Sequence, residues 1–245
     1  ELTSLSNTKY LRTRMNQMTR SLPHDINNLS SIQYMNLRTN RMTGPIPDSI
    51  VECTDLNFIA FNYNQHSGTI PNQLGSLTKM TLLAIDHNRL TGPLPSSIGK
   101  MTLLSTMLFV SNNYLTGKIP SSLEDLQFLQ NLWLNDNRFT GTIPSRILKI
   151  PALRVFRINN NNLHGDLNVL FDNITQVPKD LAVVDFTANK FSGSLPSALF
   201  EGSNELSVFA SALNCHEGSI PASICSARGL NELILSGVSQ ACPLT

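Results

Sequence analysis

Short stretches of alternating apolar and polar residues recur along the whole chain. In one of them, Met35 and Leu37 lie five and three positions before an asparagine, with a polar residue between them. A period of two predicts a short strand with one buried face. Farther along each stretch, apolar residues recur at every third position, as in Leu123, Leu126 and Leu129. This spacing predicts a 3₁₀ or loosely helical return leg.

The asparagine that follows each strand recurs at a nearly constant interval. The steps are 24 residues, except for steps of 25, 28 and 25 that end at Asn113, Asn189 and Asn214. We call these residues the repeat asparagines: Asn16, Asn40, Asn64, Asn88, Asn113, Asn137, Asn161, Asn189 and Asn214. A period in this range indicates a solenoid. Because an amide both donates and accepts, we expect these side chains to point inward and to pair with backbone groups that water cannot reach.

A glycine and a proline mark a corner after nearly every repeat asparagine. The glycine comes four residues later and is replaced only at Arg20, and the proline comes seven residues later and is replaced only at Asn168. Glycine and proline at these positions turn the backbone away from the strand. One repeat is therefore predicted to contain a strand, a corner and a return leg.

The combined pattern, LxxLxLxxNxLTGxIP, resembles the plant-type leucine-rich repeat, as in "NRLTGPLP" at 88–95. The resemblance extends from Leu2 to about Val238. It implies an α/β repeat fold: a right-handed solenoid with a parallel β-sheet on the concave face, short second strands on one flank and 3₁₀ or helical turns on the convex side. It also implies a single domain over residues 1–245, with about ten repeats of 24 residues.

The two ends depart from this pattern. The first complete repeat reads "MTRSLP" and no pair of cysteines precedes it, so we expect an uncapped amino-terminal end. Because open coils expose apolar surface, such an end is typical of a fragment or of a surface that a neighbouring subunit covers. At the other end Val238 replaces the repeat asparagine, and residues 222–245 are expected to form a capping repeat.

The four cysteines show no CxxC spacing, which argues against a zinc or thioredoxin-like site. A disulfide between Cys225 and Cys242 would close the last turn, with Cys215 as an alternative partner for either, because spacing does not determine connectivity. Cys53 occupies a leucine position and is expected to be a buried free thiol.

Candidate binding residues come from the strand positions that should face solvent. Since strand side chains alternate, the positions four, two and one before each repeat asparagine should point away from the core on the concave face. Phe109, Trp133 and Arg157 follow one another at the minus-four position and predict a binding hot spot. Alternatively, they only cover each other between repeats. Further candidates at minus two and minus one are Arg14, Arg38, Tyr63, His87 and Asp136.

Composition and charge narrow the classes of function. A net charge of +1, with 14% charged residues, gives no global attraction to nucleic acid or to an anionic membrane. No stretch approaches the ~20 consecutive apolar residues of a membrane span. The first residues, "ELTSLSNTKYLRT", lack the features of a signal peptide, so we expect any targeting segment to be removed or to lie outside this chain. No catalytic motif is present, and we expect no enzyme activity, cofactor or metal.

Two sequons, at Asn28 and Asn173, predict N-glycosylation and a secretory route. Asn28 lies five residues after Pro23, and Asn173 lies five residues after Asn168, at the same phase of the repeat. Polar residues occupy this phase in other repeats, which places it on the exposed convex leg. Glycans there would leave the concave face free.

These observations favour a non-enzymatic recognition module, extracellular or at the cell surface, that binds a protein, peptide or glycan on its concave face. An alternative is a structural segment of a larger cell-surface assembly, whose neighbouring subunits cover the uncapped end. A further alternative comes from resemblance to secreted inhibitors of polysaccharide hydrolases, although the cysteine pattern departs from theirs.

Overall fold

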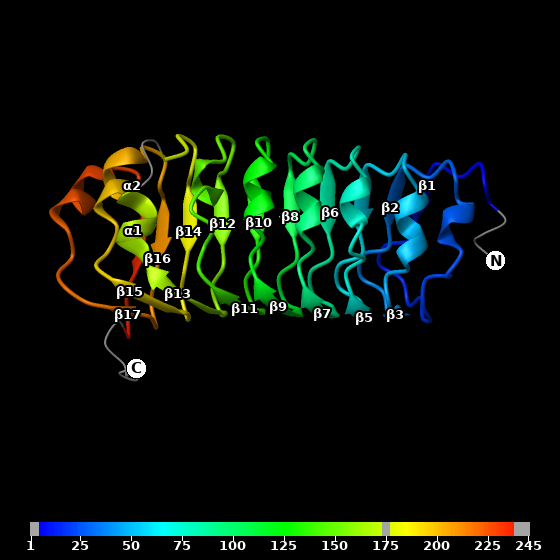
Figure 1. Ribbon diagram of the computed structural model, residues 1–245, viewed down its shortest axis with the longest axis horizontal. Helices are drawn as coiled ribbons and strands as arrows, with labels where there is room; N and C mark the ends of the chain where they lie inside the picture. The colour runs from blue at the N-terminus through cyan, green and yellow to red at the C-terminus, as the bar shows by residue number, and fades with distance from the viewer. Residues whose placement is uncertain (1–4, 173–176, 238–245) are drawn as a thin grey trace.

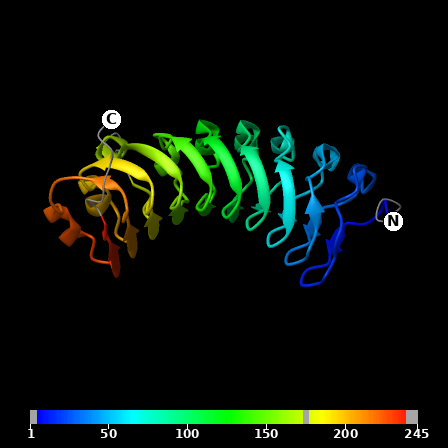
Figure 2. The ribbon, with the colours of Figure 1, turned by 90° about the horizontal axis from the view of Figure 1, so that it is seen from below.

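The computed structural model describes residues 5–172 and 177–237, and each repeat forms one coil of a curved stack (Figures 1 and 2). The ten first strands of the coils pair in chain order into one parallel sheet within the described residues. They are β1 (Tyr10–Arg12), β2 (Tyr34–Asn36), β4 (Phe58–Ala60), β6 (Leu82–Ala84), β8 (Met107–Phe109), β10 (Asn131–Trp133), β12 (Val155–Arg157), β14 (Val183–Asp185), β16 (Val208–Ala210) and β18 (Glu232–Ile234).

A second parallel sheet runs along one flank, formed by the residues around each corner glycine (Figure 1). In the described part of the chain it has eight strands: β3 (Thr43–Gly44), β5 (Gln65–Thr69), β7 (Arg89–Pro93), β9 (Tyr114–Lys118), β11 (Arg138–Gly141), β13 (Asn162–Asp166), β15 (Lys190–Gly193) and β17 (Cys215–His216). The corner glycines have positive φ, as at Gly92 (+74°). Arg20 adopts the same conformation, φ 74°, without being glycine.

The return legs lie on the outer side of the arc (Figure 2). Most are 3₁₀ turns, namely η2 (Ile26–Asn28), η3 (Asp48–Glu52), η4 (Leu74–Ser76), η5 (Ser96–Lys100), η6 (Ser121–Asp125), η7 (Ile147–Lys149) and η8 (Ala222–Ser226). Two are short α-helices, α1 (Leu167–Asp172) and α2 (Ser197–Gly202). The predicted leucine-rich-repeat solenoid, with its concave sheet, flank strands and convex turns, is confirmed.

The repeat asparagines form the predicted inward ladder. The Asn88 amide donates to the carbonyl oxygens of Phe61, Ile85 and Asp86, each at 3.1 Å, and its oxygen accepts the His66 backbone N–H at 2.9 Å. The same acceptor bond links each repeat asparagine from Asn40 to Asn214 to the preceding coil. These amides pair the backbone groups left over where each strand turns inward.

The interior between the two sheets and the return legs is one apolar cluster. His66 and His216 replace apolar residues in it and are buried, as their phase in the repeat predicts. Cys53 is a buried free thiol, also as predicted, and burial together with nearby Glu52 raises its pKa to about 11.

The expectation that Cys225 forms a disulfide with Cys242 is wrong. Cys225 lies in η8 on the convex side as a free, exposed thiol, whereas Cys215, at the start of β17 on the flank, is disulfide-bonded. Sequence spacing does not determine which cysteines pair. Cys242 and Val238 lie outside the described residues, so the capping role of residues 222–245 stays a prediction.

Candidate binding face on the concave sheet

The predicted hot spot forms a continuous stack across three neighbouring strands. Phe109, Trp133 and Arg157 are register partners on β8, β10 and β12. The rings of Phe109 and Trp133 stack with centroids 4.0 Å apart and an interplanar angle of 16°. The guanidinium carbon of Arg157 lies 5.0 Å from the centroid of the Trp133 ring. All three side chains are half-buried, so they cover each other and still present one edge of the stack to solvent.

A second stack lies where the chain leaves the strands. Tyr63 and His87 stack with ring centroids 4.1 Å apart, and the guanidinium carbon of Arg38 lies 5.3 Å from the Tyr63 centroid. Tyr63 and His87 both have positive φ, 57° and 51°, as does the minus-one residue of every other described coil. This left-handed turn directs the minus-one side chains along the edge of the concave sheet.

A third stack lies in a column that the sequence analysis missed. A column here is the set of side chains at the same position of successive repeats. The first residue of each strand, six before the repeat asparagine, also faces the concave side. In this column Tyr34 and Phe58 stack with centroids 4.0 Å apart, and the Arg12 guanidinium carbon lies 4.8 Å from the Tyr34 centroid. Starting each predicted strand one residue earlier would have included this column. Its members in the described coils are Tyr10, Tyr34, Phe58, Leu82, Met107, Asn131, Val155, Val183, Val208 and Glu232.

The minus-two column differs from the expectation in the middle of the sheet. Arg14 and Arg38 are exposed as predicted, but Asn62, Asp86 and Ser111 are 7%, 3% and 1% exposed. They lie between the minus-four column on one side and the minus-one column on the other. Each has one side-chain oxygen without a hydrogen-bond partner among the described residues.

Asp86 is the buried carboxylate of this column. Its Oδ2 lies 2.8 Å from Nδ1 of His87. Burial raises the pKa of Asp86, and the hydrogen bond and charge of His87 oppose that shift. Holding a carboxylate at this depth is costly unless it is paired, so His87 both completes the second stack and partners the buried acid.

Asp136 is engaged by its neighbours. Its carboxylate accepts the Asn160 amide at 2.7 Å and the Asn135 amide at 2.5 Å. These bonds hold the carboxylate against the turn residues and reduce its capacity for further contacts.

Charge is distributed unevenly along the concave face. Arg12, Arg14 and Arg38 are exposed in the first two described coils, and none has a salt-bridge partner among the described residues. The first coils therefore present unpaired cations, two of them held against aromatic rings, whereas the middle coils combine the rings of Phe109 and Trp133 with one cation, Arg157, and the carboxylate of Asp136.

The convex side carries the predicted glycosylation position Asn28, which is exposed at the end of η2. Asn173 lies outside the described residues. In the described part of the chain, no cluster of three histidine, cysteine or acidic side chains is placed to hold a metal ion, and no helix has the length and apolar character needed to cross a bilayer.

Comparisons with known proteins show that the chain is similar to leucine-rich-repeat structures. The family model described as Leucine Rich Repeat matches residues 106–126 and 128–150. No curated protein sequence matches the chain significantly. Among solved structures, the ectodomain of the Arabidopsis thaliana receptor kinase GASSHO1/SCHENGEN3, in complex with CASPARIAN STRIP INTEGRITY FACTOR 2, is 28% identical with a TM-score of 0.80, covering 96% of this chain and 30% of that chain.

Two further solved structures are similar to this chain. The Arabidopsis receptor kinase HAESA, in complex with the peptide hormone IDA and the co-receptor SERK1, is 29% identical with a TM-score of 0.75, covering 95% of this chain and 42% of that chain. A plant ice-binding protein is 24% identical with a TM-score of 0.80, covering 100% of this chain and 79% of that chain, and shares the fold alone. The chain thus spans less than half the length of the receptor ectodomains it resembles.

Proposed function

We propose that this chain is a non-enzymatic recognition module that binds a peptide or protein partner on its concave face, outside the cell or at its surface. The observation that carries the proposal is the set of three aromatic and arginine stacks on that face. Each combines a rigid ring surface with a guanidinium group, the residue types that dominate binding hot spots. The likeness to receptor ectodomains solved with peptide partners supports the same use of the fold.

The extracellular setting rests on two further observations. Cys215 is disulfide-bonded, and structural disulfides persist mainly in oxidising compartments. Asn28 is exposed on the convex side, where a glycan would not cover the concave stacks. Glycan recognition, a structural role in a larger assembly and inhibition of a polysaccharide hydrolase stay predictions.

The test starts from peptides that the folded wild-type chain selects from a random display library, with affinities measured by calorimetry. Trp133→Ala should weaken binding by about 30-fold or more, since loss of a central hot-spot residue costs about 2 kcal/mol or more. Phe109→Ala should act in the same direction. Phe128→Ala is the matched control, because this aromatic residue is 60% exposed but lies outside the concave columns. Unchanged affinity in both stack variants would refute the proposal.

A further inference from the structure

The corner of the Asn161 repeat differs from its neighbours. At Pro95 and Pro120, for example, the proline holds the chain extended, with ψ angles of 134° and 132°, and the return leg begins at the next residue. Asn168 takes this position in the Asn161 repeat, and α1 begins at Leu167, one residue before the proline position. Without the ring that restricts φ, the chain turns into its return leg two residues earlier.

The two flank strands at this corner pair over fewer residues than the strand pairs on either side of them. β9 and β11 pair over three residues, ending with Lys118 and Thr140. β11 and β13 pair over only two, and the missing third pair would join Thr142 to His164. The φ of Gly165 is 121°, whereas the five preceding corner glycines have φ between 74° and 81°. This corner therefore differs in backbone conformation from the five corners before it.

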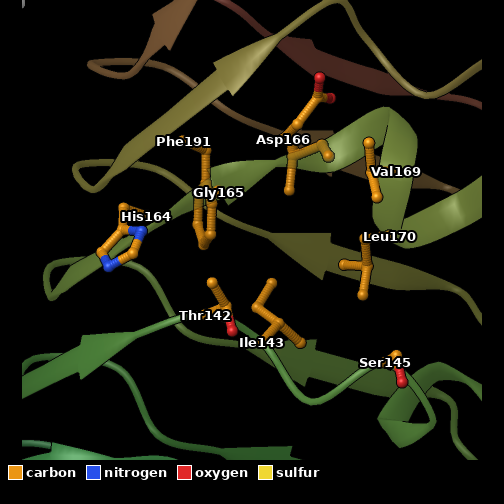
Figure 3. Close-up of a pocket in the computed structure, with 10 residues that line it drawn as sticks. Thr142, Ile143, Ser145, His164, Gly165, Asp166, Val169, Leu170 and Phe191 are labelled. Atoms are coloured by element: carbon orange, nitrogen blue, oxygen red, sulfur yellow. The ribbon is translucent and has the colours of Figure 1, made fainter.

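A hollow of about 280 Å³ lies between the corners of these two coils (Figure 3). Its base is apolar and comes from the buried side chains of Ile143, Leu167, Leu170 and Phe191. Figure 3 shows Thr142, Ile143 and Ser145 on one side of the hollow and Val169, Leu170 and Phe191 on the other. The exposed rim adds the hydroxyls of Thr142 and Ser145 and the imidazole of His164.

The size and lining define the ligand class. An apolar cavity of roughly 150 Å³ holds one benzene ring, so this hollow has room for two fused rings. The apolar base favours a flat ring, and the His164 imidazole or the Thr142 hydroxyl can meet one polar group on it. The lining includes Asp166 but, among its described residues, no lysine or arginine. An anionic ring is therefore disfavoured.

We propose that this hollow binds an uncharged two-ring aromatic group with one hydrogen-bond donor, of which indole is the simplest example. The group can be a free small molecule or the tryptophan side chain of a partner protein. The site lies at the flank corner and is independent of the concave face, so it does not rest on the function proposed above.

The test is a calorimetric and ligand-observed NMR titration of the whole chain with indole, N-acetyltryptophanamide and indole-3-carboxylate. We expect saturable binding of the two uncharged probes and at least fivefold weaker binding of the carboxylate. Thr142→Trp fills the mouth of the hollow, and Asn168→Pro restores the usual corner. Each should weaken binding of the uncharged probes at least tenfold, and if Asn168→Pro does not fold, Thr142→Trp alone decides.

Two variants serve as controls that should keep wild-type affinity. Lys118→Trp introduces the same ring at the equivalent position of the preceding repeat, where the third strand pair is intact. Trp133→Ala removes the aromatic residue at the centre of the concave face. Tighter binding of N-acetyltryptophanamide than of indole assigns the site to a protein side chain, and the reverse order assigns it to a small molecule. The proposal is overturned if neither uncharged probe binds saturably or if Thr142→Trp binds like the wild type.

Discussion

At the scale of single residues, the repeat asparagines hold the coils in phase. One amide makes as many as four hydrogen bonds to backbone groups of its own and the preceding coil, as at Asn88. This role was predictable from the sequence, because a polar residue recurring among inward apolar positions must find buried partners. The pairing of Cys215 was not predictable, because sequence spacing does not determine disulfide connectivity.

Replacing one amide in the middle of the stack should be costly. Asn137→Ala leaves the Leu115 N–H without a partner and removes one of two amide donors from the Val110 and Leu134 carbonyl oxygens, which keep the amides of Asn113 and Asn161. Because a buried group left unpaired costs about 1–3 kcal/mol, we expect a loss of about 2 kcal/mol in the free energy of unfolding, measured with urea. Asn16→Ala is the control, since among the described residues the exposed Asn16 amide bonds only to Thr13 and Arg14 of its own coil. Equal losses in both variants would show that the ladder does not stabilise the stack.

The buried histidines predict how stability depends on pH. Burial lowers the pKa of His66 and of His216 below 6.5, so the folded chain binds fewer protons than the unfolded chain in that range. Stability is therefore full above pH 6.5 and falls as the pH drops toward the folded pKa values. His66→Leu restores the apolar residue of the repeat and should reduce this loss in urea unfolding followed between pH 7.5 and 5. An unchanged pH slope would contradict burial of a neutral imidazole.

At the scale of elements, the return legs η4, η5 and η6 pack so closely that only glycine fits at Gly75 and Gly99. A Cβ added to Gly99 in η5 would lie 2.3 Å from the Ser122 carbonyl oxygen of the next leg, η6. The spacing of apolar residues predicted 3₁₀ or helical legs, but not this close approach, because it depends on how neighbouring coils are stacked. The minus-six column was missed because the strand was taken to begin one residue too late.

We expect Gly99→Ala to force η5 and η6 apart. The overlap is with backbone and cannot be relieved by a side-chain rotation, so the variant should lose about 2 kcal/mol or more in the free energy of unfolding. Lys100→Ala changes an exposed residue of the same leg and should lose less than about 0.5 kcal/mol. Urea unfolding of the two variants checks this, and a tolerated Gly99→Ala would mean that the legs lie farther apart.

At the scale of the whole molecule, the nearly constant repeat length determines which residues become neighbours on the surface. Residues 24 or 25 apart become neighbours on the concave sheet, which is why Phe109, Trp133 and Arg157 could be brought together from sequence alone. Their stacking distances, the burial of the minus-two column and the hollow at the Asn168 corner could not. These features depend on how the coils stack and on the backbone conformation at one corner, neither of which the repeat pattern encodes.

The most direct test of the concave binding face uses Trp133, the only tryptophan in the chain. A library-selected peptide is titrated into the wild-type chain while Trp133 fluorescence and the heat of binding are followed in parallel. The account predicts a saturable change in emission whose midpoint equals the calorimetric Kd, because the peptide covers the exposed edge of the Phe109, Trp133 and Arg157 stack. Saturable heat with constant Trp133 emission would contradict it.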